Sequence, residues 1–288
     1  MLSKHAFQTI GMISVFMSLF YSTGLYAQVD TAWVRTYNGP GNAGDYAAAI
    51  AVDGAGNVYV TGYCATNANW PYDFDYVTIK YYSNGDTAWV RRYIGPGVTG
   101  NNDDYGLAIV VDGTGNAYVT GHSPGSTTGD DIATIKYEPD GDTGWIRRYN
   151  GAANDVDCGN AIALDGAGNV YVTGYSYDPV TSDNYLTIKY DPSGNIQWVT
   201  EYNGSGGGGD YAKAMVVDDT GTVYITGYSF GGWPPEGMED YTTVKYTQAT
   251  AIAENKLQAI PDHLFLSPNY PNPFSGLTEI SYGVPQKT

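Results

Sequence analysis

The chain has 288 residues, a formal net charge of −17 at pH 7, and a composition rich in glycine (38) and tyrosine (28). So acidic a surface would be repelled by nucleic acid and by anionic membranes, which argues against both as partners. The length accommodates one large β-domain with appendages.

The N-terminal segment has the three regions of a secretory signal. Residues 1–27 combine the charged Lys4, an apolar run over residues 10–19 and an A-x-A-like sequence that ends at Ala27. A membrane anchor is the alternative, but the apolar run is shorter than the roughly 20 residues that span a bilayer. We therefore predict a cleaved signal peptide over residues 1–27 and no membrane span.

One unit recurs four times within residues 30–247. Each copy contains a run similar to D-G-x-G-N-x-Y-V-T-G, followed by a segment similar to T-I-K-Y, which ends the copies at Tyr81, Tyr137, Tyr190 and Tyr246. A period of about fifty residues with several short strand patterns indicates a repeat array.

Four strand-like segments, separated by Gly, Asn and Asp clusters, make up each unit. In the first copy they are 46–52, 57–61, 76–81 and 87–93, which we call A, B, C and D. Segment A is apolar on both sides, which predicts a strand covered on both faces. Polarity then rises towards C, which predicts that A lies at the hub of a propeller blade. Segment D carries a tryptophan with an arginine or threonine two residues later, which suits an outer strand.

The phase of the repeat predicts how the array closes. The repeat region opens with a lone D segment, residues 31–37, and ends with A, B and C over residues 211–246. Residues 31–37 can therefore supply the fourth strand of the last blade, which would remove the exposed edges. We predict an all-β, four-bladed β-propeller of four-stranded antiparallel blades, spanning 45–93, 104–149, 157–202, and 210–246 joined by 31–37. A wider propeller assembled with a second chain, or a β-sandwich, are the alternative architectures.

The A-to-B links have the sequence D-G-x-G-N or a close variant, as in Asp53–Asn57. Glycine supplies positive φ and aspartate bonds its own following amides, so a hairpin turn is expected. Calcium is the alternative ligand of these aspartates, but the run lacks the full set of oxygen ligands of a calcium loop. We predict no cofactor and no metal site. Cys64 and Cys158 lie at different positions of different repeats, which favours two small semi-buried residues over a disulfide.

The repeat sequence resembles a known family. The D-G-x-G-N-x-Y-V-T-G run followed by T-I-K-Y is similar to the bacterial β-propeller repeat called SBBP and, more distantly, to the NHL repeat. The resemblance covers residues 30–247 and implies a propeller that is extracellular or on the cell surface. It implies little about function, because this fold hosts unrelated activities.

The C-terminal residues 264–288 resemble the opening of the sorting domain carried by type IX secretion substrates. The motif N-Y-P-N-P-F stands at residues 269–274, and the later strands of such a domain are missing, so a truncated sorting domain is expected. The preceding residues 248–263 are interpreted as a linker. The resemblance implies passage through the type IX machinery to the exterior or outer surface of a Gram-negative bacterium.

Strand order assigns the long, variable D-to-A and B-to-C connections to one face, where binding function usually resides. Exposed aromatics there can stack on sugar rings while carboxylates bond hydroxyls, although all of them could instead be packing residues of the loops. The candidate ligand-binding residues are Trp70, Tyr72, Phe74, Tyr177, Phe230, Trp233, Asp45, Asp104, Asp157 and Asp210.

Catalysis has less support than binding. Outside the predicted signal, the histidines are His122 and His263, and neither has a nucleophile motif around it. The candidate aspartates recur at matching repeat positions, which favours a scaffold role. We therefore expect a secreted or cell-surface, non-enzymatic propeller that binds an extracellular glycan or protein. A glycan-active enzyme and a purely structural surface or adhesion protein are the alternatives.

Overall fold

The computed structural model describes residues 29–70, 72–97, 102–231 and 238–248, together with two short paired strands, β16 (Phe265–Leu266) and β17 (Tyr282–Gly283). Contacts divide the chain into two units, Met1–Thr36 and Tyr37–Thr288. The predicted signal peptide, nearly all of the predicted linker and the N-Y-P-N-P-F motif lie outside the described residues. No helix within the described part of the chain is long and apolar enough to cross a membrane.

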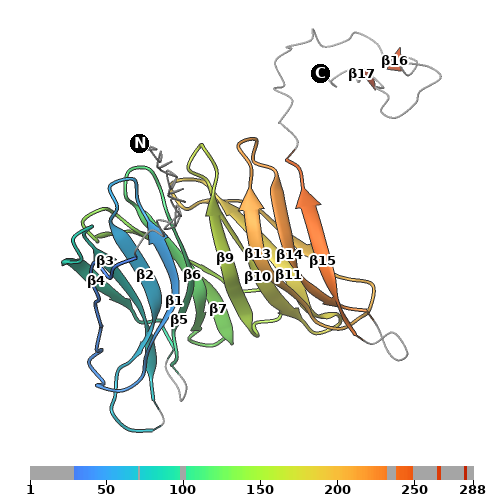
Figure 1. The fold of residues 1–288 in the computed structure, drawn as a ribbon. Coiled ribbons are helices and arrows are strands. Elements are labelled where there is room, and N and C mark those ends of the chain that lie inside the picture. The colour runs from blue at the N-terminus through green and yellow to red at the C-terminus, as the bar shows by residue number, and fades with distance from the viewer. Residues whose placement is uncertain are drawn as a thin grey trace, which may run out of the picture. The chain divides into compact units, whose positions relative to one another are not determined.

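Four antiparallel sheets follow one another along residues 45–246, as the repeat predicts (Figure 1). The first sheet contains β1 (Asp45–Val52), β2 (Val58–Ala65), β3 (Phe74–Tyr81) and β4 (Thr87–Tyr93). The second contains β5 (Tyr105–Val111), β6 (Ala117–Pro124), β7 (Asp130–Tyr137) and β8 (Thr143–Tyr149). The third contains β9 (Asp157–Leu164), β10 (Val170–Asp178), β11 (Ser182–Tyr190) and β12 (Ile196–Tyr202). The fourth contains β13 (Asp210–Val217), β14 (Val223–Phe230) and β15 (Glu239–Tyr246).

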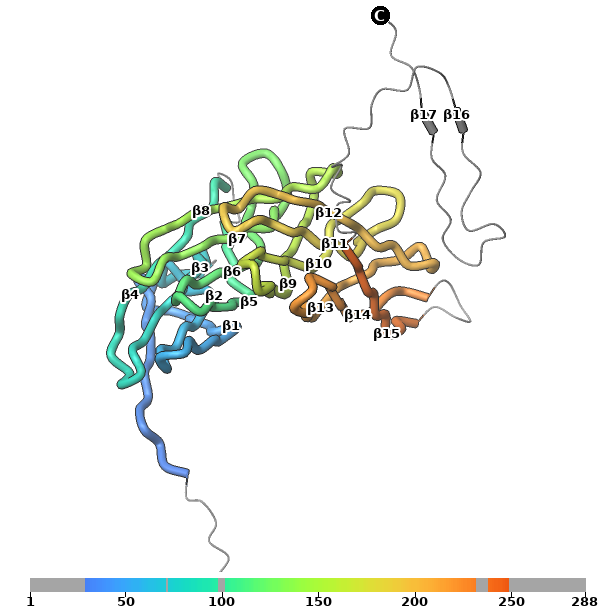
Figure 2. Tube along the Cα trace, turned by 90° about the horizontal axis from the view of Figure 1, so that it is seen from above, coloured from blue at the N-terminus to red at the C-terminus, as the bar shows by residue number. Residues whose placement is uncertain are grey.

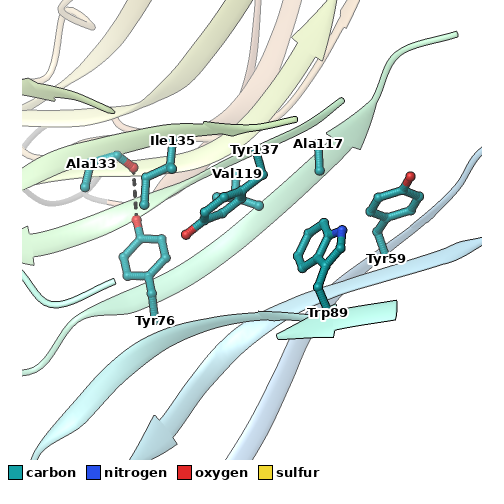
Figure 3. Close-up of a cluster of buried hydrophobic side chains, with 8 residues drawn as sticks. All are labelled: Tyr59, Tyr76, Trp89, Ala117, Val119, Ala133, Ile135 and Tyr137. Carbon is teal, nitrogen blue, oxygen red and sulfur yellow. Dashed lines mark hydrogen bonds between the residues drawn. The ribbon is translucent and has the colours of Figure 1, made fainter. Parts of the chain in front are cut away.

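Neighbouring sheets are joined by one repeated apolar interface. At the first of these, Tyr59, Tyr76 and Trp89 of the first sheet pack against the second sheet, and Figure 3 shows these side chains beside Val119, Ile135 and Tyr137. The equivalent residues of the second sheet, Tyr118, Ile132 and Trp145, pack on the third sheet. Tyr171, Tyr185 and Trp198 repeat the contact between the third and fourth sheets. The core therefore consists of three similar layers, each lying between two sheets, and a further cluster on the first sheet around Cys64, Val77, Ile79 and Tyr81.

Hydrogen bonds across each interface fix the position of one sheet against the next. Tyr76 donates its hydroxyl to the carbonyl of Ala133 at 3.0 Å, and Trp89 Nε1 donates to Pro139 O at 3.1 Å. The same tryptophan contact recurs one sheet later, where Trp145 Nε1 donates to the carbonyl of Pro192 at 3.2 Å. These bonds satisfy polar groups that would otherwise be buried without partners.

Closure of the ring by residues 31–37 is not observed. These residues form no strand, and the fourth sheet has three strands, ending at β15. Tyr37 instead packs beside Val77, Ile79 and Tyr81 of the first sheet. Within residues 37–248 the first and fourth sheets lie at opposite ends of the row (Figures 1 and 2), because each interface joins only successive sheets.

The burial of the A strands follows the expectation inside the row of sheets but not at its end. In β5 of the second sheet, Ile109 and Val111 pack at the interface with the first sheet and Val110 packs at the interface with the third. In β1, at the end of the row, Ile50 is 67% exposed, and every residue is intermediate or exposed. The most buried strands are the B and C strands of the first three sheets, such as β6 and β7. They are central in their sheets and carry neighbours on both sides, whereas each A strand is a sheet edge.

The A-to-B turns have the predicted mechanism. Asp53 Oδ1 accepts hydrogen bonds from the amides of Ala55 and Asn57, both at 2.9 Å. Gly56 has φ +78°, and the matching Gly115, Gly168 and Gly221 are also left-handed. The carboxylate oxygens are thus engaged by their own turn, which supports the turn interpretation over a calcium loop. Both cysteines, Cys64 and Cys158, are buried and unpaired.

Replacement of Gly115 tests the turn geometry. Gly115→Ala places a Cβ at φ +88°, and we expect a loss of about 1 to 2 kcal/mol in the free energy of unfolding. Gly113→Ala, in the same turn, is the control because a Cβ there meets nothing within 4 Å. Urea unfolding of both variants measures the difference, and equal stability of the two would contradict the assigned role of Gly115.

Candidate functional site

A row of aromatic side chains marks the end of the sheets where the D-to-A and B-to-C connections emerge. It arises because the first or second residue of an A strand lies directly opposite the sixth residue of the B strand, as in Tyr46 opposite Tyr63 and Tyr105 opposite His122. The third sheet pairs Cys158 with Tyr175. We call this set the aromatic band: Tyr46, Tyr63, Tyr105, His122, Tyr175, Tyr211 and Tyr228.

The band is continuous across the first two sheets. The ring centroids of Tyr46 and Tyr63 lie 5.1 Å apart, and those of Tyr63 and Tyr105 lie 4.6 Å apart across the sheet boundary. Tyr105 then stacks on His122 at 4.9 Å with an interplanar angle of 23°. Offset and edge-to-face contacts of this kind fix the rings in place.

A second stretch of the band crosses the third and fourth sheets. The rings of Tyr175 and Tyr211 meet edge to face at 4.9 Å, and Tyr211 lies 5.1 Å from Tyr228. Lys213 Nζ lies 5.6 Å from the centre of the Tyr211 ring and 5.4 Å from that of Tyr228. A cation at these distances is attracted to the aromatic faces.

Carboxylates from a D-to-A connection and from the first residues of two C strands contact the polar ends of the band. The hydroxyl of Tyr105 donates to Asp103 Oδ2 at 3.2 Å, and that of Tyr211 donates to Asp183 Oδ2 at 2.5 Å. His122 Nδ1 lies 2.9 Å from Asp130 Oδ2. Burial and the nearby Asp103 raise the pKa of Tyr105 to about 12, so this hydroxyl stays protonated at neutral pH.

The predicted aromatics of the first sheet join the band. Trp70 contacts Tyr72 at 5.8 Å, Tyr72 contacts Phe74 at 6.0 Å, and Phe74 lies 5.4 Å from Tyr63. Trp70 is 83% exposed, so it forms the solvent-facing end of this series.

The other predicted aromatics are not part of the aromatic band. Tyr177, near the end of β10, is half-buried and lies opposite Asp183. Phe230 ends β14, and its ring lies over Gly208, where a Cβ would approach within 2.3 Å. Trp233 lies outside the described residues.

The predicted aspartates bind the backbone of their own connections. Asp104, Asp157 and Asp210 are fully or almost fully buried. Each accepts the amide of a glycine in its own D-to-A connection, from Gly95 at 2.8 Å for Asp104 and from Gly151 at 2.6 Å for Asp157. The half-buried Asp45 and the buried Asp210 make the same contact with Gly39 and Gly204. The geometry gives these four carboxylates the role of loop clamps, because they close the connections that border the band.

Sequence reasoning missed the strand residues of the band. The predicted aromatics were assigned to the B-to-C connections, whereas Tyr63, Tyr105 and Tyr211 lie within strands. The available signal was the recurrence of an aromatic residue at matching positions of the A and B segments. The carboxylates beside the band, Asp103 and Asp183, neighbour predicted positions but were not among the predicted site residues.

A cavity of about 610 Å³ lies at the opposite end of the A strands. Its lining includes Val111, Asp112, Ile162, Leu164 and Met215. The carboxylate of Asp112 is engaged by Thr114 and Asn116 of its own turn, so the cavity offers mainly apolar walls. Within the described residues, no group of three His, Cys, Asp or Glu side chains is placed to hold a metal ion.

The sequence matches one protein family in two segments. The SBBP family, described as a beta-propeller repeat, matches residues 35–68 and 144–179. Two segments of the chain therefore match a β-propeller repeat, in agreement with the four repeated sheets of the structure. An uncharacterized WD repeat-containing protein of Acanthamoeba polyphaga mimivirus is 34% identical over 110 residues, which cover 32% of this chain and 8% of that protein.

Two solved structures show distant likeness. A protein of unknown function from Bacteroides caccae has a TM-score of 0.39 and 11% identity, covering 62% of this chain and 52% of that one. A subtype N11 neuraminidase-like protein of a flat-faced bat virus (H18N11) has a TM-score of 0.34 and 7% identity, covering 66% and 57%. The chain thus spans little more than half of each structure, and neither likeness bears on its activity.

The loop clamps predict a pH dependence of stability. Burial removes Asp104 from water and raises the pKa of its carboxyl group to about 6, and burial does the same for Asp157. Because these values lie above the pKa of about 3.9 of an unfolded aspartate, the folded state binds the proton more tightly. The resulting stabilisation is complete below about pH 4 and is lost as the pH rises through about 6.

Asp104→Asn isolates this contribution, because the amide oxygen can still accept the Gly95 amide without becoming charged. We expect the wild type to lose stability relative to this variant between pH 4.5 and pH 7.5, measured by urea unfolding at both values. The exposed Asp219→Asn is the matched control and should follow the wild type. A difference between Asp104→Asn and wild type that does not change with pH would contradict the assignment.

Proposed function

We propose that this β-propeller repeat protein is a secreted or cell-surface binding scaffold that holds a carbohydrate ligand on the aromatic band. The observation that carries the proposal is the unbroken series of rings from Trp70 through Tyr63 to His122. Ring faces in a row offer stacking surfaces for successive sugar rings. A sugar ring has an apolar face and polar edges, and an aromatic side chain packs well against such a surface.

The polar groups beside the rings suit the same ligand. Sugar hydroxyls donate hydrogen bonds to carboxylates such as Asp103 and Asp130, which lie beside Tyr105 and His122. The net charge of −17 disfavours a strongly anionic ligand. A neutral or weakly charged glycan is therefore the class that best matches the chemistry of the band.

The proposal also includes the route of export and the absence of catalysis. Residues 1–27 would direct export across the inner membrane, and residues 264–288 would engage the type IX machinery of a Gram-negative cell. The fourfold repetition of the clamp aspartates supports a scaffold, because an enzyme needs a single arrangement that differs from its surroundings. Fractionation of cells that express the chain with and without residues 264–288 tests the second step of export.

Ligand binding is tested with variants of exposed band residues. Trp70→Ala and Tyr46→Ala remove rings that are 83% and 52% exposed, so the fold should be retained. We expect each to weaken binding of a neutral oligosaccharide selected on a glycan array by about tenfold, which corresponds to the roughly 1.4 kcal/mol expected for one aromatic contact. Isothermal titration calorimetry measures the change.

The matched control is Tyr82→Ala, which removes a tyrosine of similar exposure, 51%, from the turn after β3 at the other end of the sheet. It should bind like the wild type. Equal affinity of all three variants would contradict a site on the band, and the absence of binding to any glycan would favour a structural role. Hydrolysis of the bound oligosaccharide would show that the protein is an enzyme.

A further inference from the structure

The two ends of the row of sheets expose the two halves of the interface that joins the sheets internally. At each internal boundary, one sheet contributes a tyrosine-bearing downstream face and the next contributes an aliphatic upstream face. The fourth sheet has a downstream face and the first sheet has an upstream face. Neither is covered by another of the four sheets, since the apolar clusters join only successive sheets.

The downstream face of the fourth sheet is exposed at positions that are buried elsewhere. Tyr241 occupies the place of Tyr76, Ile132 and Tyr185, which are almost completely buried. Tyr241 itself is 98% exposed, and Val216 on β13 is 64% exposed. The hydroxyls of Tyr76 and Tyr185 each donate to a carbonyl of the following sheet. Tyr241 carries the same hydroxyl donor, but the described part of residues 37–248 contains no sheet after the fourth that could accept its hydrogen bond.

The upstream face of the first sheet is exposed along β1, whereas Val77 and Ile79 on the same face are buried beside Tyr37. Ile50 and Val52 occupy the places of Ile109 and Val111, which pack against the interface between the first and second sheets. Ile50 is 67% and Val52 is 60% exposed. This aliphatic face is therefore the repeat equivalent of the surface that covers Tyr76.

The fourth sheet also lacks its outer strand. In the first three sheets the C strand pairs with a D strand, and the register places Thr78 opposite Arg91 and Lys80 opposite Trp89. The second sheet has the same register, with Thr134 opposite Arg147. Residues 31–37 have the sequence T-A-W-V-R-T-Y, nearly that of β4 (T-A-W-V-R-R-Y). Paired with β15 in this register, they would set Arg35 opposite Thr243.

The position of Tyr37 supports this assignment. Tyr93, Tyr149 and Tyr202 end the D strands of the first three sheets, and each packs on the upstream face of the sheet that follows. Tyr37 packs in the equivalent place on the first sheet, beside Val77 and Ile79. Tyr37, at the end of residues 31–37, thus occupies the position that a D-strand tyrosine would have if another sheet preceded the first one.

We infer that this preceding sheet is the fourth sheet of a second copy of the chain. Residues 31–37 of each copy would pair with β15 of the other, and the first sheet of each would cover Tyr241 of the other. Each copy has one upstream and one downstream end, so two copies join at both ends and leave no free edge. The product is a ring of eight sheets, because each copy supplies four, and eight lies within the usual range of propellers.

The chain's own residues 31–37 are the competing occupant. In that arrangement the first and fourth sheets of one copy would have to meet, but two other sheets separate them along residues 37–248 (Figure 2). The packed interfaces between those sheets fix their relative positions. A second copy can place its first sheet against the fourth sheet of this copy while the interfaces within each copy stay unchanged. This inference is independent of the proposed ligand.

A disulfide placed across the proposed strand pair tests it. The full chain with Arg35→Cys and Thr243→Cys carries thiols on directly opposite residues, a spacing at which disulfides form. We expect mild oxidation to give a covalent dimer with twice the 30.9 kDa chain mass on a non-reducing gel. The native cysteines are buried, so oxidised wild-type protein is the background control.

Val34→Cys with Thr243→Cys is the register control, because a shift of one residue turns the side chain to the other face of the strand. It should form little dimer. Three results would overturn the inference: a cross-linked monomer, which shows that the chain closes on itself; a ladder of higher multimers, which shows an open array; and no cross-link beyond the register control.

Analytical ultracentrifugation provides an independent measurement on the unmodified fold. The wild type should sediment as a dimer, and Tyr241→Asp should shift it to a monomer because a charge would enter the covered face. Trp70→Asp, at an exposed residue of a B-to-C connection, is the matched control and should stay dimeric. A wild-type monomer at all concentrations, or a dimer unaffected by Tyr241→Asp, would contradict the inference.

Discussion

The structure depends on one interaction that recurs at every sheet boundary. A tyrosine from the B strand and a tryptophan from the D strand of one sheet join valine and isoleucine side chains of the next in one apolar cluster, as Tyr59 and Trp89 do with Val119 and Ile135 (Figure 3). Large aromatic side chains bury more apolar surface than any others. At the first boundary, the hydroxyl of Tyr76 and Trp89 Nε1 also donate to carbonyls of the second sheet, so hydrogen bonds as well as packing fix one sheet against the next.

This interface explains where ligand chemistry can reside. The middle of each sheet is occupied by packing, which leaves the ends of the strands and their connections for other roles. Buried carboxylates such as Asp157 hold the D-to-A connections in place by accepting a glycine amide. The aromatic band lies beside these clamped connections. A rigid row of rings therefore stands on a scaffold whose loops are fixed by buried hydrogen bonds, which suits binding without a large loss of conformational entropy.

The repeat sequence was sufficient to predict the sheets, their strand order and their turns. The D-G-x-G-N run predicted a left-handed glycine, and Gly56 has that conformation. The repeat sequence was not sufficient to predict how the array closes. The order of the strands shows that residues 31–37 can complete a sheet, but it does not say whether that sheet belongs to the same chain or to a second copy. Of the candidate ligand-binding residues, Trp70 and Phe74 are in contact with rings of the first sheet, and their role in binding stays a prediction. The burial of Asp104 could not be predicted, because a recurring aspartate beside a loop has the same pattern whether it faces solvent or binds its own backbone.

The central claim is that each sheet is stabilised by its neighbours through the shared interface, as in other repeat proteins. Hydrogen exchange of an Ile188→Ala variant tests it most directly. Ile188 is completely buried between the second and third sheets, and its truncation should cost about 2 to 5 kcal/mol. The account predicts faster amide exchange in both β6–β7 and β10–β11, with a smaller effect in β2–β3. Faster exchange confined to β11, or an equal change in all four sheets, would contradict it.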